Sequence, residues 1–143
     1  MKLLFALAAV GAGIATALQA AANGGLATRA GLGAALVLNT CIVLAGTLAF
    51  FVATGSRGTF FPPGTPWFYY IGGLCGFTVI LAAAFVLPKI GAGTAVALMV
   101  LGQGIAALAI DHFGLLGVTR QPASPVRLGA FALIVVGVAL LRR

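Results

Sequence analysis

The stretch GAGTAVALMVLGQGIAALAIDHFGLLG, residues 91–117, decides how this chain is interpreted. It is an apolar segment with one amide, Gln103, near its middle and the only acidic residue of the protein, Asp111, near its far end. Its first part is long enough to cross a bilayer as a helix, which takes about 20 apolar residues. Because the 143 residues contain no other acidic side chain, any chemistry that needs a carboxylate side chain must use Asp111.

The chain as a whole is also strongly apolar, with 62% hydrophobic residues, 6% charged residues and a mean hydropathy of +1.22. A globule of this size could not bury so much apolar surface, and the apolar runs are continuous rather than alternating as in a membrane β-barrel. The first run is also longer than the apolar core of a secretory signal, which is about 7 to 15 residues. The sequence therefore predicts an all-α integral membrane protein, a single domain over residues 1–143 with five transmembrane helices. The expected spans are about 2–22, 30–53, 66–87, 91–110 and 126–141.

Several function classes are disfavoured by the same composition. The net charge of +7 would suggest nucleic acid for a soluble protein, but these cations lie at span ends, as lipid-headgroup anchors do. We therefore expect contact with the lipid bilayer and no nucleic-acid partner. The sequence shows no catalytic grouping of Ser, His and Asp, no metal-ligand cluster and no phosphate-binding loop, so we predict no enzyme, no cofactor and no metal site. Cys41 and Cys75 fall inside expected spans and carry no disulfide framework.

Amide side chains are the main polar groups inside the spans. Gln19 and Asn23 are four residues apart and share one helix face, and Gly24 and Gly25 are expected to end that helix. Asn39 lies about 13 Å below the membrane surface, where an unpartnered amide is costly, so it should face protein or a water-filled cavity. These amides either bind a substrate or only join neighbouring helices, with Asn23 as a helix cap.

Two further groups have both a functional and a structural interpretation. Trp67 and Tyr70 follow a loop rich in Gly and Pro, residues 54–65, and form either an interfacial aromatic belt or a wall of a binding site. Asp111, with His112 beside it, is the candidate proton carrier of a coupled transporter. Its structural alternative is an anchor at the membrane surface that pairs with Arg120 or Arg127.

The basic residues are shared evenly between the two membrane faces if five spans are assumed. One face holds Lys2, Arg57, Arg120 and Arg127, and the other holds Arg29, Lys89, Arg142 and Arg143. A chain without charge bias has no strong electrostatic reason to insert one way up. We expect both orientations to form and two inverted copies to pair as an antiparallel dimer of ten helices. The alternatives are a single orientation set by other cues and a sister chain that supplies the inverted half.

Three motifs resemble one family of membrane proteins. LQAAANGGLA, GQGIAALAIDHFGLLG and the final RLGAFALIVVGVALLRR resemble the YdcZ-like group of the drug/metabolite transporter superfamily. The resemblance implies a small multi-pass protein of the bacterial inner membrane that works as a half-transporter. It also implies characteristic polar residues at Gln19, Asn23, Gln103, Asp111 and His112. The small multidrug resistance proteins are distantly similar, but their first helix carries a glutamate, and the first span here has no carboxylate.

The leading hypothesis is therefore a half-unit of a secondary transporter for a small organic metabolite or drug-like solute, uncharged or zwitterionic. Its partners would be a second inverted copy, or a sister chain, and the small-molecule substrate. The expected substrate-binding residues come from four helices, and they are Gln19, Asn23, Asn39, Trp67, Tyr70 and Gln103. The alternative is a passive pore or a structural membrane subunit without a transport cycle of its own.

Overall fold

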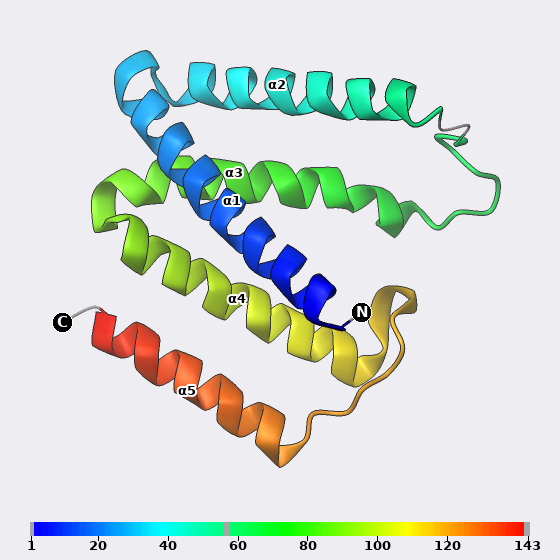
Figure 1. The fold of residues 1–143 in the computed structure, drawn as a ribbon, viewed down its shortest axis with the longest axis vertical. Coiled ribbons are helices and arrows are strands. Elements are labelled where there is room, and N and C mark those ends of the chain that lie inside the picture. Colours follow the sequence, from blue (N-terminus) through cyan, green and yellow to red (C-terminus); the bar gives the residue numbers. More distant parts are fainter. Residues whose placement is uncertain (1, 56–57, 142–143) are drawn as a thin grey trace. The chain divides into compact units, whose positions relative to one another are not determined.

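The computed structural model describes residues 2–55 and 58–141, which divide into two compact units, residues 1–89 and 90–143. Most of the described residues are helical, and the helices are joined by two one-residue turns and by two longer connections, residues 54–66 and 114–124 (Figure 1). The α-helices are α1 Lys2–Ala30, α2 Leu32–Ala53, α3 Gly72–Ile90, α4 Ala92–Phe113 and α5 Pro125–Leu141. Two 3-10 helices, η1 Trp67–Ile71 and η2 Leu115–Gly117, precede α3 and follow α4.

The predicted class of helical membrane protein is confirmed by the length and composition of these helices. Among the described residues, α1, α2, α4 and the combined segment Trp67–Ile90 are long and apolar enough to cross a membrane. The last helix, α5, has 17 residues and spans about 26 Å at the rise of an α-helix, close to the lower limit for a crossing. A fifth crossing by α5 therefore stays a prediction.

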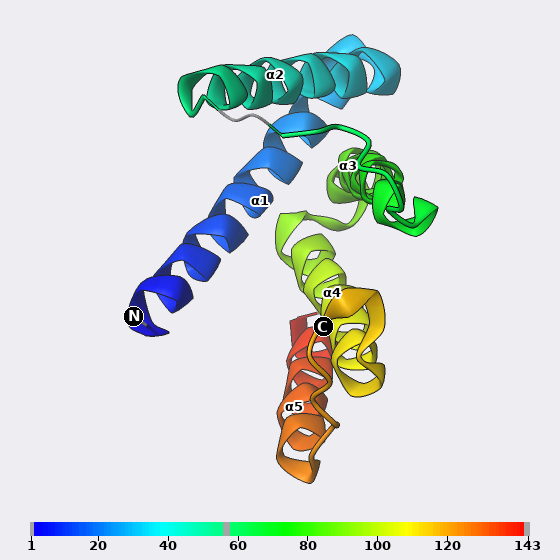
Figure 2. The same cartoon turned by 90° about the vertical axis from the view of Figure 1, so that its right-hand side faces the viewer.

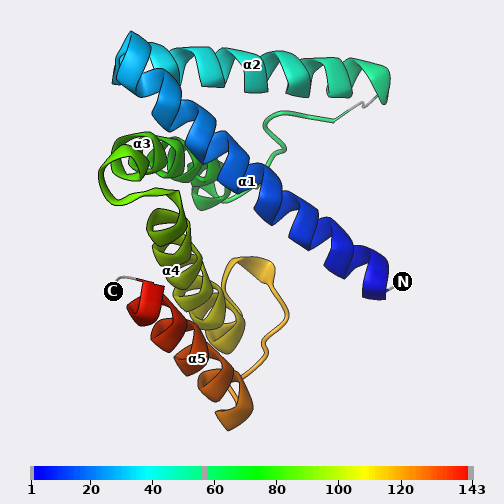
Figure 3. The same cartoon turned by 60° about the vertical axis from the view of Figure 1, so that its left-hand side comes forward.

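The first unit is built around the pair α1 and α2, which meet at one tight turn and diverge from it (Figure 3). Contrary to expectation, Gly24 and Gly25 do not end α1, which continues to Ala30. The physical reason is backbone conformation: a glycine ends a helix when it takes a positive φ, and along the described part of α1 and its turn the first glycine with a positive φ is Gly31. Gly24 is buried and faces the Pro88 ring on α3, where a Cβ would make an ordinary van der Waals contact at 3.5 Å.

A single glycine connects α1 to α2, and a second glycine does the same between α3 and α4. Gly31 has φ 88 and ψ 151, and Gly91 has φ 81 and ψ 153, a conformation that L side chains avoid. Each glycine carbonyl accepts the N–H of the alanine four residues on, at 3.1 Å, and Ala35 and Ala95 are almost fully buried. The two turns thus have the same local structure, although the sequence shows no repeat of fixed period.

The end of α3 differs from the expected one. Residues 88–90, expected to link two spans, belong to α3, with Pro88 inside the helix.

The second unit consists of α4 and α5, which lie side by side (Figure 2). Their contact depends on Gly104 of α4, because a Cβ there would overlap the edge of the Phe131 ring on α5. Ser124 begins α5 as its N-cap: its Oγ accepts the N–H of Arg127 at 3.3 Å, and Pro125 takes the first helical position. The helix starts one residue before the expected Val126.

Large apolar side chains are exposed on all sides of these helices. Examples from both units are Leu4 at 69%, Phe50 at 69% and Leu133 at 73% exposure. A helix that is apolar all round is stable only when lipid or other helices surround it. The molecule therefore offers lipid-compatible surfaces, and its few buried polar groups stand out against them.

Candidate functional site

Three amides from α1 and α2 meet about two to three helical turns away from Gly31. Gln19 Nε2 and Asn23 Nδ2 both donate to the same atom, Asn39 Oδ1, at 3.2 and 3.1 Å. The four-residue spacing of Gln19 and Asn23 places both side chains on one face of α1, as the sequence predicted. We call Gln19, Asn23 and Asn39 the amide triad. Asn23 does not cap a helix end, because α1 continues beyond it.

The amide triad is buried on one side and open on the other. Asn23 is 7% exposed and Asn39 is 9% exposed, whereas Gln19 is exposed. Asn39 Nδ2 is buried and has no hydrogen-bond partner. An amide donor without a partner in an apolar environment costs several kcal/mol by transfer scales, or about 1–3 kcal/mol by mutation in proteins. The triad therefore has one hydrogen-bond donor, Asn39 Nδ2, without an acceptor.

The other expected substrate-binding residues have no hydrogen bond to the triad among the described residues. Gln103 is exposed on α4, in the second unit. Trp67 and Tyr70 lie in η1 and are 75% and 45% exposed. Their ring contacts are with Phe68 and Phe61, with centroids 6.3 and 5.6 Å apart. This arrangement is typical of aromatic residues at a membrane interface.

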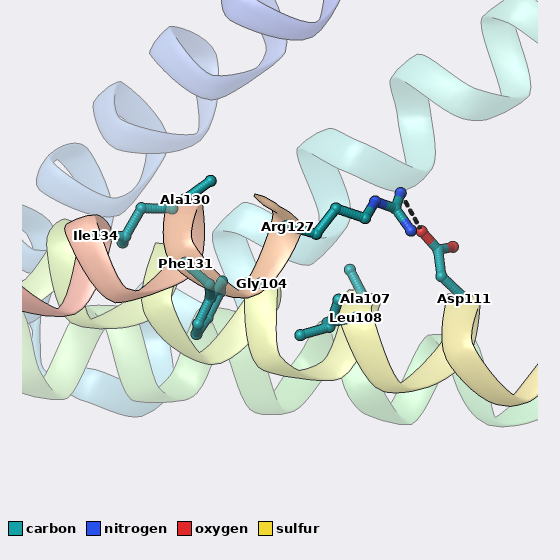
Figure 4. Close-up of a pocket in the computed structure, with 8 residues that line it drawn as sticks. All are labelled: Gly104, Ala107, Leu108, Asp111, Arg127, Ala130, Phe131 and Ile134. Carbon is teal, nitrogen blue, oxygen red and sulfur yellow. Dashed lines mark hydrogen bonds and ion pairs between the residues drawn. The ribbon is translucent and has the colours of Figure 1, made fainter. Parts of the chain in front are cut away.

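Asp111 forms an ion pair at the end of α4. Arg127 Nη2 on α5 donates to Asp111 Oδ2 at 3.0 Å, as Figure 4 shows. The side chains of Arg127 and Asp111 are 39% and 29% exposed. Arg127 also donates to the backbone oxygen and to Oε1 of Gln121, both at 3.2 Å. The predicted pairing of Asp111 with one of two arginines is confirmed, and Arg127 is the partner.

The chain after α4 folds back onto the carboxyl end of that helix. Gln121 N–H donates to the backbone oxygen of Asp111 at 2.7 Å, and Arg120 Nε donates to that of His112 at 3.0 Å. The Ala123 N–H donates to His112 Nδ1 at 3.1 Å. These bonds satisfy helix carbonyls that would otherwise lack partners, and the guanidinium opposes the negative end of the helix dipole. His112 thus fixes the connection. In the part of the chain that the structure describes, no group of three His, Cys, Asp or Glu side chains could hold a metal ion.

A groove of about 240 Å³ runs along α4 and α5 next to the ion pair (Figure 4). Asp111 and Arg127 lie at one end, and apolar residues cover the rest. The lining residues are Gly104, Ala107, Leu108, Asp111, Arg127, Ala130, Phe131 and Ile134. The groove is hydrophobic over most of its length, and its charges are paired with each other.

Gln121 and Phe131 are structural contributors that the sequence interpretation missed. Gln121 bonds Arg127 through both its backbone and its side chain, and Phe131 packs on Gly104. A local signal existed for the first: Ser124 and Pro125 mark a helix start, which places Gln121 and Arg127 on either side of it. The contact of Phe131 with Gly104 depends on the register between two helices, which no local pattern gives.

The length of the helices and their apolar surfaces define a multi-pass helical membrane protein, and the family match places it among inner membrane exporters, a class of membrane transporters. The chain belongs to the YdcZ family, whose description reads "Putative inner membrane exporter, YdcZ" and which matches residues 4–140. The predicted family is thus confirmed. Neither the curated proteins nor the solved structures contain a match to this chain.

Proposed function

We propose that this protein is half of a secondary transporter, and that the amide triad is part of its substrate site. The observation that supports this most directly is the burial of Asn23 and Asn39 inside helices that are otherwise apolar. Polar groups are rare at membrane depth, and those present commonly mark a transport pathway. The triad has no charged member, so it suits an uncharged or zwitterionic solute, such as a small metabolite or a drug-like molecule.

The second half of the transporter would be an inverted copy of the same chain. Its support is the equal division of the basic residues, four on each face, if α5 also crosses the membrane. Lys2, Arg57, Arg142 and Arg143 enter that count by sequence, because their side chains lie outside the described residues. In an inverted pair, exchange of the two conformations opens the same cavity to the other side. Gln103, Trp67 and Tyr70 would contribute to that cavity, and Asp111 with His112 would carry protons if transport is proton-coupled.

Side-specific labelling tests the inverted pair. Thr59→Cys places a thiol in the exposed connection between α2 and η1, in a chain whose Cys41 and Cys75 are replaced by Ala. We expect an impermeant thiol reagent to label about half of the copies from each face, since the basic residues give no bias. Labelling from one face only would reject dual insertion and leave a sister chain as the partner.

Charge-biased variants provide the matched control. Arg142→Ser with Arg143→Ser removes two cations from one face, and Lys2→Ser with Arg57→Ser removes two from the other. Each double variant should insert mainly one way up, in opposite directions, and co-expression of the two should restore the pairing that neither forms alone. Cross-linking between Thr59→Cys in one variant and Thr28→Cys in the other would measure it, because an inverted pair places these two exposed positions on the same membrane face.

A structural membrane subunit is the second candidate, because the triad joins α1 to α2 in the way that helix-joining amides do. Expression of the wild-type chain should release a solute into the medium, detected by mass spectrometry, and Asn39→Leu should abolish that release at equal protein level. If Asn39→Leu changes stability but leaves the solutes of the medium unchanged, the structural role is the correct one.

A further inference from the structure

We propose that Asn39 is the contact point for the solute and that the amide triad can reverse its polarity, so that it binds either a hydrogen-bond acceptor or a donor. The inference rests on the proposed function, because it identifies the chemistry of the same site. It starts from the unpaired amide nitrogen. Gln19 and Asn23 converge on one atom of Asn39, so one side of its amide is satisfied twice and the other side is left without a partner.

In the arrangement of the structure, the unused atom is a donor. Asn39 Oδ1 accepts two hydrogen bonds, and the two hydrogens of Asn39 Nδ2 have no acceptor. A carbonyl, ether or hydroxyl oxygen of a solute would satisfy this nitrogen. Binding would then recover the free energy that the unpaired amide costs the empty site.

The opposite arrangement needs only a half-turn of each terminal amide. The amides of Asn and Gln carry a donor and an acceptor at nearly equivalent positions, and their terminal torsions are soft. After such a turn, Asn39 Nδ2 donates its two hydrogens to Gln19 Oε1 and Asn23 Oδ1. The number of bonds between α1 and α2 is unchanged, and the unused atom is now Asn39 Oδ1, an acceptor. The same position can thus receive an N–H or O–H group.

This property requires an amide at all three positions. A carboxylate cannot donate, and in this membrane setting it would add an uncompensated charge. The side-chain hydrogen bonds of the triad run between its own amides, and within residues 2–55 and 58–141 no ion pair fixes their orientation. The site therefore suits neutral solutes that carry an amide, carbonyl or hydroxyl group.

Gln19 is the member that must move for a solute to enter. Its side chain belongs to an exposed residue, while Asn23 and Asn39 are more than nine-tenths buried. Ala20 and Ala35, which are also buried, keep the neighbouring positions on the two helices small. Rotation of Gln19 away from Asn39 would expose the inner amides, at the loss of one hydrogen bond that the solute replaces.

Two small probes test the proposal on the full chain in lipid nanodiscs. N,N-dimethylacetamide only accepts hydrogen bonds, and indole only donates one through its N–H. The measurement is the ¹⁵N–¹H signal of the Asn39 side chain, identified by its loss in Asn39→Leu. We expect each probe to shift this signal saturably, with dissociation constants within about tenfold of each other, since either arrangement makes the same number of bonds.

Two variants lock the triad in one polarity by different routes. When ionised, Asn39→Asp presents an acceptor only, and ionised Gln19→Glu forces Asn39 Nδ2 to donate toward position 19, which leaves Asn39 Oδ1 free. Both variants are therefore measured at a pH high enough to ionise the new carboxyl group, because its neutral form could donate. Both variants should keep indole binding and weaken N,N-dimethylacetamide binding by about tenfold or more. In Asn39→Asp, which lacks the Asn39 amide, binding is measured from the side-chain amide signal of Asn23. Gln19→Glu lies on the exposed side, so it remains informative if Asn39→Asp fails to fold. Thr40→Val, at the exposed residue next to Asn39, is the control and should bind both probes as the wild type does.

The proposal is overturned if only one probe binds the wild type, if neither binds, or if both locked variants keep N,N-dimethylacetamide at full affinity. It is also overturned if the Asn39 amide shows a direct contact to a side chain of a second copy, which would supply the missing partner without a solute. These experiments need no transport and no inverted orientation. A failure of dual insertion and a failure of polarity reversal would thus be told apart.

Discussion

The amide triad and the Asp111–Arg127 ion pair each join two apolar helices, the first with neutral groups and the second with charged groups. Between α1 and α2, the joining groups are neutral, two of them are buried, and one nitrogen is left unpaired. Between α4 and α5, the joining groups are charged and partly exposed, and Arg127 bonds both Asp111 and Gln121. The charged cluster is satisfied by its own members, whereas the neutral one is not.

This difference teaches where each kind of group can be used in a membrane protein. A charge is tolerated at a helix end, where water or headgroups screen it, and there it can fix a connection. An amide can lie deeper because its desolvation costs less than that of a charge. We therefore assign recognition to the triad and assembly of the second unit to Asp111, and the following variants test that division.

The largest effect is expected from a change that separates α4 from α5. Gly104→Leu would place a side chain where the Phe131 ring lies, and such overpacking costs about 1–3 kcal/mol. The free energy of unfolding, measured by circular dichroism in a detergent titration, should fall by that amount. Gly102→Leu is the matched control, because nothing lies within 4 Å of a Cβ there. Phe131→Ala should partly rescue Gly104→Leu, and equal losses for the two glycines would contradict the packing argument.

The amide triad should respond next, with a graded loss. Asn23→Ala removes a buried partner of Asn39 and should cost about 1–2 kcal/mol of unfolding free energy, whereas Gln19→Ala, at an exposed residue, should cost about 0.5 kcal/mol. The same titration measures both, with Thr40→Ala as the control at an exposed neighbour. A larger loss of unfolding free energy for Gln19→Ala than for Asn23→Ala would contradict the assignment of Asn23 as the buried and Gln19 as the exposed member of the triad.

The ion pair should contribute less to stability than the buried amides. Asp111→Asn removes a partly exposed charge pair, which is typically worth about 0–1 kcal/mol. Because salt screens such pairs, the difference between Asp111→Asn and wild type should shrink in about 1 M NaCl. The cost of Asn23→Ala should not change with salt. A salt-independent loss for Asp111→Asn would mean that this carboxylate is less exposed to water than its position indicates.

The smallest effect on the free energy of unfolding is expected at Gly24. Gly24 is compared with Gly104 because a Cβ fits at Gly24 and overlaps a ring at Gly104. A Cβ at Gly24 would meet the Pro88 ring at 3.5 Å, an ordinary van der Waals contact. Gly24→Ala should therefore leave the free energy of unfolding unchanged or raise it by up to about 1 kcal/mol, since alanine restricts the unfolded chain. Gly25→Ala, with open space around its Cβ, is the control. A loss above about 1 kcal/mol at Gly24 alone would indicate that α1 and α3 pack more tightly than described.

The membrane class, the family and most helix limits could be predicted from the sequence, because they depend on local composition and length. The hydrogen bonds of Gln19 and Asn23 to Asn39 could be predicted only in part. The four-residue spacing placed Gln19 and Asn23 on one face of a helix, but their contact with Asn39 depends on how α1 and α2 pack. The continuation of α1 through Gly24 and Gly25 could not be predicted, because a glycine ends a helix only where it takes a positive φ, and that conformation lies at Gly31 instead. The choice of Arg127 over Arg120 for Asp111 depended in the same way on the path of the connection before α5.

The glycines Gly31 and Gly91 have a consequence for what the aqueous phases can reach. Consecutive membrane crossings alternate in direction, so both one-residue turns belong to one face of each copy, while residues 54–66 and 114–124 belong to the other. If α1, α2, the segment Trp67–Ile90 and α4 all cross the membrane, the connections at Gly31 and Gly91 each present only a one-residue turn to a protease, an antibody or a soluble regulator. If copies insert both ways up, each compartment meets a smooth surface from one copy and a looped surface from its neighbour, and a single epitope in residues 58–66 would report the ratio of the two.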